Sequence, residues 1–259
     1  MSKLPKNYQF FDFSDYGRLP GSWIAKRLKN TFFTPIHVTT MFVIVGFFAV
    51  FFILNEYYIS AAFLIILKSV LDAADGELSR LKQTPSYVGR YYDSIADIIL
   101  NFFFLLSFWY VSEISILLML SAFFCIQIQG TIYNFYYVIL RNKVNGDSTS
   151  RIFEDSSPKA LKGESQKMVD FFYKLYDLLY ITFDKLIYYV DKKAIRVNLP
   201  FPNWFMTLIS LYGLGFQLLI MAIMLIFNLY VYIIHFFIYY SALSFLIIGI
   251  RKFLLKSQK

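Results

Sequence analysis

The segment from Leu71 to Asp97 reads LDAADGELSRLKQTPSYVGRYYDSIAD and carries four aspartates in two pairs. On a helix, residues three or four positions apart lie on the same face, so Asp72 and Asp75 share one face and Asp93 and Asp97 share another. If the two helices pack together, the four carboxylates meet in one place. The segment therefore predicts two helices joined by a short turn, with an acidic centre between them.

Both acidic helices continue into long apolar stretches, where an ionisable side chain is costly and marks a functional site. Carboxylates held close together repel one another, and cations remove the conflict. Ligand sets made of carboxylate oxygens suit Mg²⁺ or Mn²⁺. Two such ions about 3.5 to 4 Å apart can stabilise both the attacking and the leaving oxygen of a displacement at phosphorus. The acidic centre therefore predicts a metal-dependent site for a pyrophosphate substrate.

The composition of the chain is that of an integral membrane protein. Hydrophobic residues make up 58% of the 259 residues and aromatic residues 21%, and the mean hydropathy is +0.54, well above an ordinary soluble domain. A helix crosses a bilayer with about 20 apolar residues. Stretches of this kind lie at 36–55, 59–80, 88–111, 114–140, 203–228 and 229–250. We therefore predict an all-α polytopic membrane protein with six transmembrane helices.

The basic residues are distributed unevenly between the two sides of this arrangement. Six of the 25 lie in residues 1–35, three in the 80–90 turn, eleven in residues 141–201 and four in the C-terminal tail. The remaining one is Lys68, inside the second predicted span. Because Lys and Arg are enriched in cytoplasmic loops, we expect both termini and the acidic turn to face the cytoplasm. The net charge of +8 then suits anionic lipid headgroups and anionic substrates, and we expect no nucleic-acid partner.

The sequence divides into a tail and a membrane domain. Residues 1–35 are predicted to form a cytoplasmic tail with an interfacial amphipathic helix over Tyr16–Phe33, and residues 36–255 the six-helix domain. Within that domain, 141–201 is predicted as a cytoplasmic loop that contains an amphipathic helix over Met168–Lys193. Its aspartates recur every seven residues and are expected to be solvated. Thr34-Pro35 and Thr84-Pro85 are typical of helix starts before the first and third spans.

The acidic segment also resembles a known family. The signature D-x2-D-G-x2-A-R-x8-G-x3-D-x3-D is that of the CDP-alcohol phosphotransferases, and the chain departs from it only at Ser79, where the family usually has Ala. The resemblance covers roughly residues 30 to 255. It implies a membrane enzyme of phospholipid biosynthesis that transfers a substituted phosphate group from a CDP-alcohol to an acceptor hydroxyl and releases CMP. It also implies a homodimer. Family habit points to a bacterial inner membrane, although an endoplasmic reticulum membrane would satisfy the same distribution of basic residues.

The resemblance assigns roles to individual residues. Two metal ions would hold the pyrophosphate, with Asp72, Asp75 and Asp93 as ligands, and Asp97 would be the base and a metal neighbour. The resemblance and the two glycines on the acidic faces together imply a set of nucleotide-binding residues. These are Asp72, Gly76, Ser79, Arg80 and Gly89.

The substrates stay open at this point. CDP-diacylglycerol is the expected donor, because the site opens near the bilayer interface. Arg151, with Lys143, Lys159 and Arg196, could bind a phosphorylated polyol such as inositol phosphate or glycerol 3-phosphate, but serine or a lipid-linked alcohol would also serve as acceptor. Lys68 could bind the acceptor phosphate or an acidic ligand, or form a salt bridge with Asp72. A divalent-cation transporter and a non-catalytic membrane scaffold are the rival functions.

Overall fold

The computed structural model describes residues 4–144, 156–196 and 200–256, which form helices and no strand. Four short 3-10 helices and ten α-helices follow one another along this part of the chain. The 3-10 helices are η1 (Lys6–Tyr8), η2 (Phe13–Asp15), η3 (Lys192–Arg196) and η4 (Tyr230–Tyr232). The α-helices are α1 (Arg18–Leu28), α2 (Pro35–Leu54), α3 (Tyr58–Lys82), α4 (Tyr87–Ser112), α5 (Ile116–Lys143), α6 (Gln166–Asp191), α7 (Asn203–Ser210), α8 (Leu214–Ile226), α9 (Ile233–Tyr240) and α10 (Leu243–Lys256).

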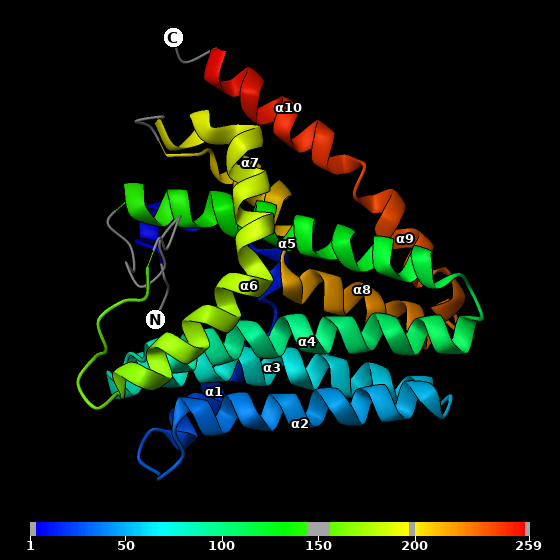
Figure 1. The fold of residues 1–259 in the computed structure, drawn as a ribbon, viewed down its shortest axis with the longest axis horizontal. Coiled ribbons are helices and arrows are strands. Elements are labelled where there is room, and N and C mark those ends of the chain that lie inside the picture. Colours follow the sequence, from blue (N-terminus) through cyan, green and yellow to red (C-terminus); the bar gives the residue numbers. More distant parts are fainter. Residues whose placement is uncertain (1–3, 145–155, 197–199, 257–259) are drawn as a thin grey trace.

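Helix α2 packs against both α3 and α4, and the axes of the three helices run in nearly the same direction as one layer in this view (Figure 1). Helix α8 packs against α3, and α5 packs against α4 and α9. Helix α6 runs across α4 and α5 instead of along them, and α10 diverges from the layer of α2 to α4 (Figure 1). The predicted all-α class is therefore confirmed.

The largest apolar core lies between these helices. Phe42 on α2 and Phe104 and Phe108 on α4 are fully buried in it. Gly46 lets α2 approach α4, because a Cβ atom at this position would lie 2.6 Å from Cδ2 of Leu100. Helices inside a bilayer associate through van der Waals packing of this kind, because lipid tails are as apolar as the side chains. The tight packing fixes α4 against α2, and so fixes the helix face that carries Asp93 and Asp97.

Within the described residues, four helical segments are each long and apolar enough to cross a bilayer: α2, α4, α5 and the stretch Tyr230–Phe253. The pair α7 and α8 adds a fifth if it counts as one broken span. Helix α3 occupies the second predicted span, but every window of 18 residues in it holds at least three charged side chains. The predicted count of six is thus compatible with the structure, and α3 differs from the others because charged side chains are spread over its C-terminal part, from Lys68 to Lys82.

The fifth predicted span, 203–228, is not one continuous helix. Its two halves are bent by 46° at a break between Ser210 and Leu214. The N-terminal segment fills this break: the Phe13 amide donates to Ser210 Oγ at 3.0 Å, and a Cβ atom at Gly215 would lie 1.9 Å from the Ser14 carbonyl oxygen. The predicted span is thus present as a bent pair of helices, and a segment from the other end of the sequence packs into the bend.

The two predicted helix starts have different outcomes. Thr34 caps α2 as expected, since its side chain accepts a hydrogen bond from the His37 amide and Pro35 is the first helical residue. Helix α4 instead begins after Ser86, whose side chain accepts from the Gly89 amide at 2.8 Å. The expectation that Thr84-Pro85 would start this helix was therefore wrong by two residues.

The two predicted amphipathic helices are present as α1 and α6. Helix α1 exposes Trp23 but packs its small residues on α3, where a Cβ atom at Gly21 would lie 2.9 Å from the Ala74 amide nitrogen. Asp191, expected to be solvated, is instead buried at the end of α6, where it pairs with Arg251 and accepts from the Tyr136 hydroxyl at 2.7 Å. A regular spacing of acids on one helix cannot reveal a cation that lies 60 residues further along the chain.

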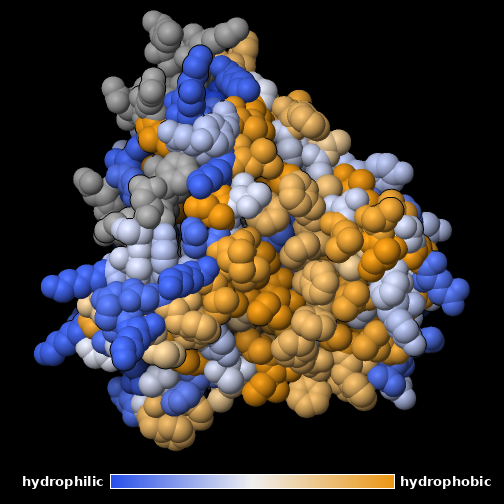
Figure 2. Space-filling model, viewed as in Figure 1, coloured by the Kyte–Doolittle hydropathy of each residue, from blue (hydrophilic) through white to orange (hydrophobic). Residues whose placement is uncertain are grey.

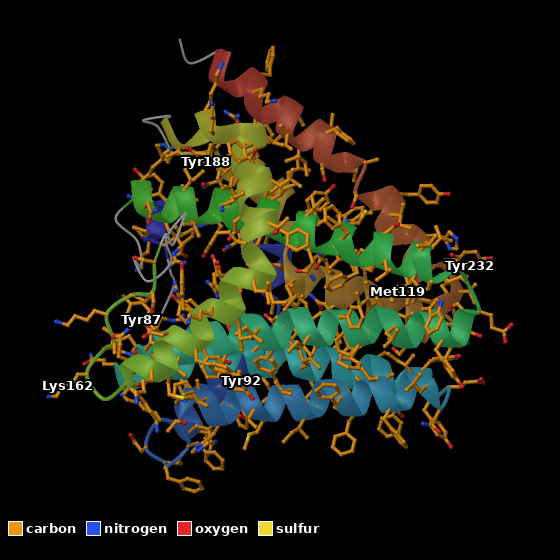
Figure 3. The ribbon with its side chains drawn as sticks, viewed as in Figure 1. Tyr87, Tyr92, Met119, Lys162, Tyr188 and Tyr232 are labelled. Carbon is orange, nitrogen blue, oxygen red and sulfur yellow. The ribbon has the colours of Figure 1, made fainter. Side chains whose placement is uncertain are left out.

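The surface has a hydrophobic band with hydrophilic residues gathered at one end. That end carries the turn between α3 and α4, and orange side chains cover the middle of the molecule in this view (Figure 2). Tyr87 and Lys162 lie at the hydrophilic end and Tyr232 at the opposite end (Figure 3). Such a band is what a bilayer requires of the surface it surrounds, and the chain is an integral membrane protein.

Candidate functional site

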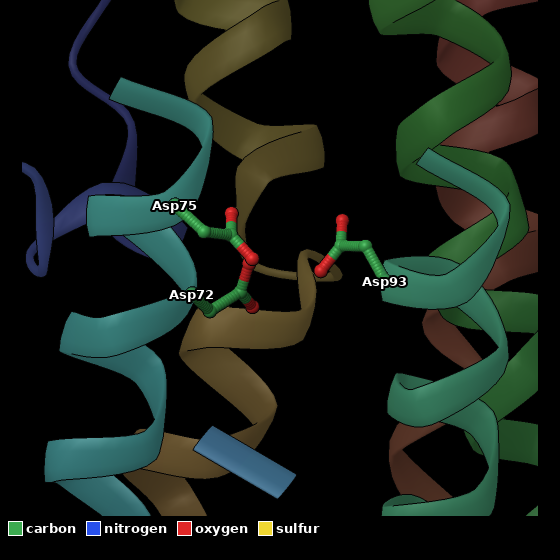
Figure 4. A group of neighbouring side chains, drawn as sticks. All are labelled: Asp72, Asp75 and Asp93. Carbon is green, nitrogen blue, oxygen red and sulfur yellow. The ribbon is translucent and has the colours of Figure 1, made fainter. Parts of the chain in front are cut away.

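Three carboxylates meet between α3 and α4 at the hydrophilic end of the bundle. Asp72 and Asp75 project from α3 toward Asp93 on the facing α4 (Figure 4). One oxygen from each carboxylate lies within 4.8 Å of the other two. Three oxygens at this separation can be drawn onto one cation with small side-chain movements, since Mg²⁺ binds oxygen at about 2.0 to 2.1 Å.

The surrounding residues hold these carboxylates without satisfying all of their oxygens. Thr39 on α2 donates to Asp75 Oδ2 at 2.6 Å, and both side chains are buried. Among the described residues, no hydrogen-bond donor reaches the buried Oδ1 atom of Asp93. A buried carboxylate oxygen without a donor requires an explanation, and a divalent cation supplies one. The residues present therefore fit a metal ion.

Asp97 lies one turn beyond Asp93 and is paired differently. Its Oδ1 atom forms a salt bridge with Lys68, whose ammonium also donates to Asp72 Oδ2 at 3.1 Å. The Lys68 side chain is 1% exposed and lies over the ring of Phe42, with Nζ 4.5 Å from the ring centroid. Lys68 was considered as an acceptor ligand or as a partner of Asp72, and the structure places its ammonium between Asp72 and Asp97.

The four aspartates line a cavity of about 1380 Å³. Parts of α2, α3, α4 and α5 contribute to its lining, together with the N-terminal segment and residues 161–165. A cavity of this size exceeds the usual range for a single small ligand. It has room for more than one small ligand.

The residues expected to bind nucleotide lie on one wall of this cavity: Gly76, Ser79, Arg80 and Gly89. A Cβ atom at Gly76 would have no neighbour closer than the Arg80 guanidinium at 3.6 Å, so the space above the helix is open. Arg80 is oriented by Glu77, with Nη2 2.8 Å from Oε2. The Ser79 hydroxyl donates to the Thr84 carbonyl at 3.2 Å, so the additional hydroxyl of this chain is satisfied locally.

Glu164 is part of the same wall and was missed at the level of sequence. Its Oε1 atom accepts from the Ser86 hydroxyl at 2.7 Å and from the Val88 amide at 2.9 Å, at the first turn of α4. These are among the amide groups that a helix start leaves without partners. Partial burial disfavours the charged form, but the hydrogen bonds from Ser86 and the Val88 backbone outweigh it and lower the pKa of Glu164. No local motif marks this residue, because its partners lie more than 70 positions earlier.

The N-terminal segment and α5 form another part of the cavity wall. Asp12 Oδ2 accepts from the Tyr133 hydroxyl at 2.7 Å, and Arg18 pairs with Asp15. These four residues and Arg141 all line the cavity. The wall therefore offers two guanidinium groups, two carboxylates and a phenol to a ligand in the cavity.

The other residues considered for the acceptor are not brought together in the described structure. Lys143 donates to the Ala194 carbonyl at 3.2 Å, and Lys159 is exposed. Arg151 and the side chain of Arg196 lie outside the described residues.

Comparison with known proteins gives one match. Residues 32–153 match the family model of the CDP-alcohol phosphatidyltransferases. The matched range contains α2 to α5 and all four aspartates, whereas α1, Glu164 and α6 lie outside it. No curated protein and no solved structure matches the chain.

Proposed function

Because the chain belongs to the CDP-alcohol phosphatidyltransferase family and is therefore a transferase of substituted phosphate groups, we propose that it transfers a phosphatidyl group from CDP-diacylglycerol to an acceptor hydroxyl. CMP is the second product. The observation that carries the proposal is the meeting of Asp72, Asp75 and Asp93 in a cavity that also contains Gly76 and Arg80. A pyrophosphate is bound by cations and guanidinium groups, and this cavity offers carboxylate ligands for cations and the guanidinium of Arg80.

The protein's own groups suit an in-line displacement at phosphorus. Asp97 accepts the proton of the acceptor hydroxyl, whose oxygen then forms a bond to the phosphorus that carries the donor alcohol. The bond from this phosphorus to the bridging oxygen breaks, and CMP leaves with the electron pair. Arg80 binds the phosphates of the nucleotide, and the bare backbone at Gly76 allows the nucleotide to lie against α3. Two bound Mg²⁺ or Mn²⁺ ions would neutralise the pyrophosphate oxygens and stabilise the leaving phosphate.

The environment of the cavity supports the choice of substrates. The chain is embedded in lipid, so a donor with two acyl chains can reach the cavity from the bilayer. Arg18 and Arg141, which also line the cavity, suit an acceptor with an anionic group, such as inositol phosphate or glycerol 3-phosphate. We expect the cavity and both termini to face the cytoplasm of a bacterial inner membrane, and we expect a homodimer from the family.

Release of CMP by the purified protein in detergent tests this proposal. The assay contains CDP-diacylglycerol, Mg²⁺ or Mn²⁺ and one of several acceptors, and compares the wild type with Asp97→Asn. Asp177→Asn on α6 is the matched control, because Asp177 does not line the cavity. Acceptor-dependent CMP release that is lost in Asp97→Asn and retained in Asp177→Asn supports the transferase.

Two other outcomes would reject it. Protein that binds Mn²⁺ but neither binds cytidine nucleotides nor releases CMP with any acceptor would point to cation transport. Folded protein that binds neither metal nor nucleotide would point to a scaffold.

A further inference from the structure

One buried cation in the acidic centre has no part in the chemistry described above. Lys68 carries its ammonium among the carboxylates, yet it is 1% exposed and does not line the cavity. Burying an ammonium is costly unless it is paired. Here two carboxylates pair with it, those of Asp72 and Asp97, and the ring of Phe42 lies under it.

The ammonium contacts two of the four carboxylates. Asp72 and Asp97 contact Lys68. Asp75 has Thr39 as its donor, and Oδ1 of Asp93 is buried without a donor among the described residues. The group of three that can hold a cation consists of Asp72, Asp75 and Asp93 and leaves Asp97 out. One position for a cation is therefore formed by carboxylates alone, whereas the space between Asp72 and Asp97 already contains a positive charge.

We propose that Lys68 is a built-in counter-charge that occupies one of the two cation positions, so that the protein without its donor binds one divalent cation per chain. This inference rests on the proposed function and concerns the same site. Lys68 is a positioning residue in this scheme. It holds the Asp97 carboxylate beside the metal position and keeps a second ion from binding between Asp97 and Asp72 until the donor is present.

The balance of charge explains why the donor changes the number of ions. Four ionised carboxylates, one ammonium and one divalent cation leave a single net negative charge. Without the donor, the site therefore attracts a second divalent cation only weakly. The pyrophosphate of the donor adds two negative charges and several ligand oxygens. Sites of this kind commonly complete the metal shell with substrate phosphate.

The number of Mn²⁺ ions bound by detergent-solubilised protein tests the proposal. Isothermal titration gives the number, and electron paramagnetic resonance shows whether two ions lie close enough to couple. We expect one Mn²⁺ per chain in the wild type, two coupled ions in Lys68→Met, and one in Lys68→Arg, which keeps the charge. Lys185→Met on the exposed face of α6 is the control for loss of a positive charge and should bind one ion.

Two ions in the donor-free wild type, or one ion in a folded Lys68→Met variant, would overturn the proposal. A second measurement needs no variant, in case the loss of Lys68 prevents folding. Addition of cytidine 5′-diphosphate, which carries a pyrophosphate, should raise the wild type from one bound Mn²⁺ to two. An unchanged number would overturn the proposal as well.

These outcomes are independent of the transferase assay. If the ion numbers follow the expected pattern and no acceptor yields CMP, the assignment of Lys68 stands and the proposed function fails. If CMP is released while Lys68→Met binds the same number of ions as the wild type, the reverse holds.

Discussion

The floor of the cavity and its walls are built in different ways. The floor consists of Asp72, Asp75 and Asp93 on two adjacent helices, and these residues lie within about 20 positions of one another. Parts of the walls come from the N-terminal segment and the segment around Glu164, which reach the cavity through contacts over 70 to 200 positions. The floor lies inside the range that matches the family, and these wall segments lie outside it. The chemistry is therefore carried by local sequence, whereas the shape of the pocket depends on long-range packing.

Removal of one floor carboxylate should separate activity from stability most clearly. We expect Asp93→Asn to lower kcat by about 10³-fold, because the loss of a metal ligand removes several kcal/mol of charge stabilisation. The melting temperature should not fall, since Oδ1 of Asp93 has no donor among the described residues. Steady-state kinetics and thermal unfolding check the two parts. If Asp93→Asn loses activity only because it unfolds, then Asp93 stabilises the fold and its role as a metal ligand is not supported.

A wall substitution should have the opposite pattern. A Cβ atom at Gly215 would lie 1.9 Å from the Ser14 carbonyl oxygen, so Gly215→Ala must displace the N-terminal segment. We expect a loss of about 1 to 3 kcal/mol in stability, as for other overpacked sites, together with a higher KM for the acceptor. Gly249→Ala is the control, because a Cβ atom there meets no neighbour within 4 Å. Equal melting temperatures for the two variants would contradict the docking of this segment.

A substitution at Glu164 tests the contact between residues 161–165 and the start of α4, and its expected effect is smaller. Glu164→Ala removes the acceptor for Ser86 and Val88 at the start of α4, and we expect a three- to tenfold higher donor KM with little change in kcat, on the order of 1 kcal/mol. Glu113→Gln, at the opposite end of α4, should leave both constants unchanged. A fall in kcat with an unchanged KM would place Glu164 in the chemical step instead.

The pH dependence of this contact has a defined sign. The folded-state pKa of Glu164 is lowered, so its contribution to stability is fully present above the unfolded-state pKa, about 4.3 for Glu. It is lost as the pH falls through the lowered folded-state pKa. Thermal unfolding of the wild type between pH 6 and pH 3 should therefore show a decrease that Glu164→Gln lacks. If the melting temperatures of the two proteins fall in parallel with pH, the ionised Glu164 carboxylate does not stabilise this contact.

The smallest effect is expected at Ser79. Its hydroxyl donates only to the Thr84 carbonyl among the contacts described here, and the family usually has Ala at this position. Ser79→Ala should change activity by less than about twofold and stability by less than about 1 kcal/mol. CMP release and thermal unfolding check both values. A tenfold change in nucleotide affinity would show that the hydroxyl contacts the donor.

The difference between local sequence signals and long-range packing also explains which features could be predicted from the sequence. Spacing places the aspartates on two helix faces, and hydropathy gives the helices that carry them, because both signals repeat within a few residues. The cap at Thr34 was predictable for the same reason. The start of α4 at Ser86 depends on Glu164, the break before Gly213 depends on Ser14, and the burial of Asp191 depends on Arg251. None of these partners is near in sequence, so local patterns could not reveal them. The roles of individual site residues stay predictions.

The packing of the N-terminal segment into the break between α7 and α8 affects the order in which the protein can assemble during synthesis. Residues 13–15 leave the ribosome early, but their docking site at Ser210 and Gly215 is made some 200 residues later. The segment must therefore wait undocked while α2 to α5 are inserted into the bilayer. Docking of this segment closes a long loop. The entropic cost of closing a loop grows only slowly with its length, so the late docking costs little extra stability. The pocket is therefore complete only near the end of translation, after the docking site at Ser210 and Gly215 has been made.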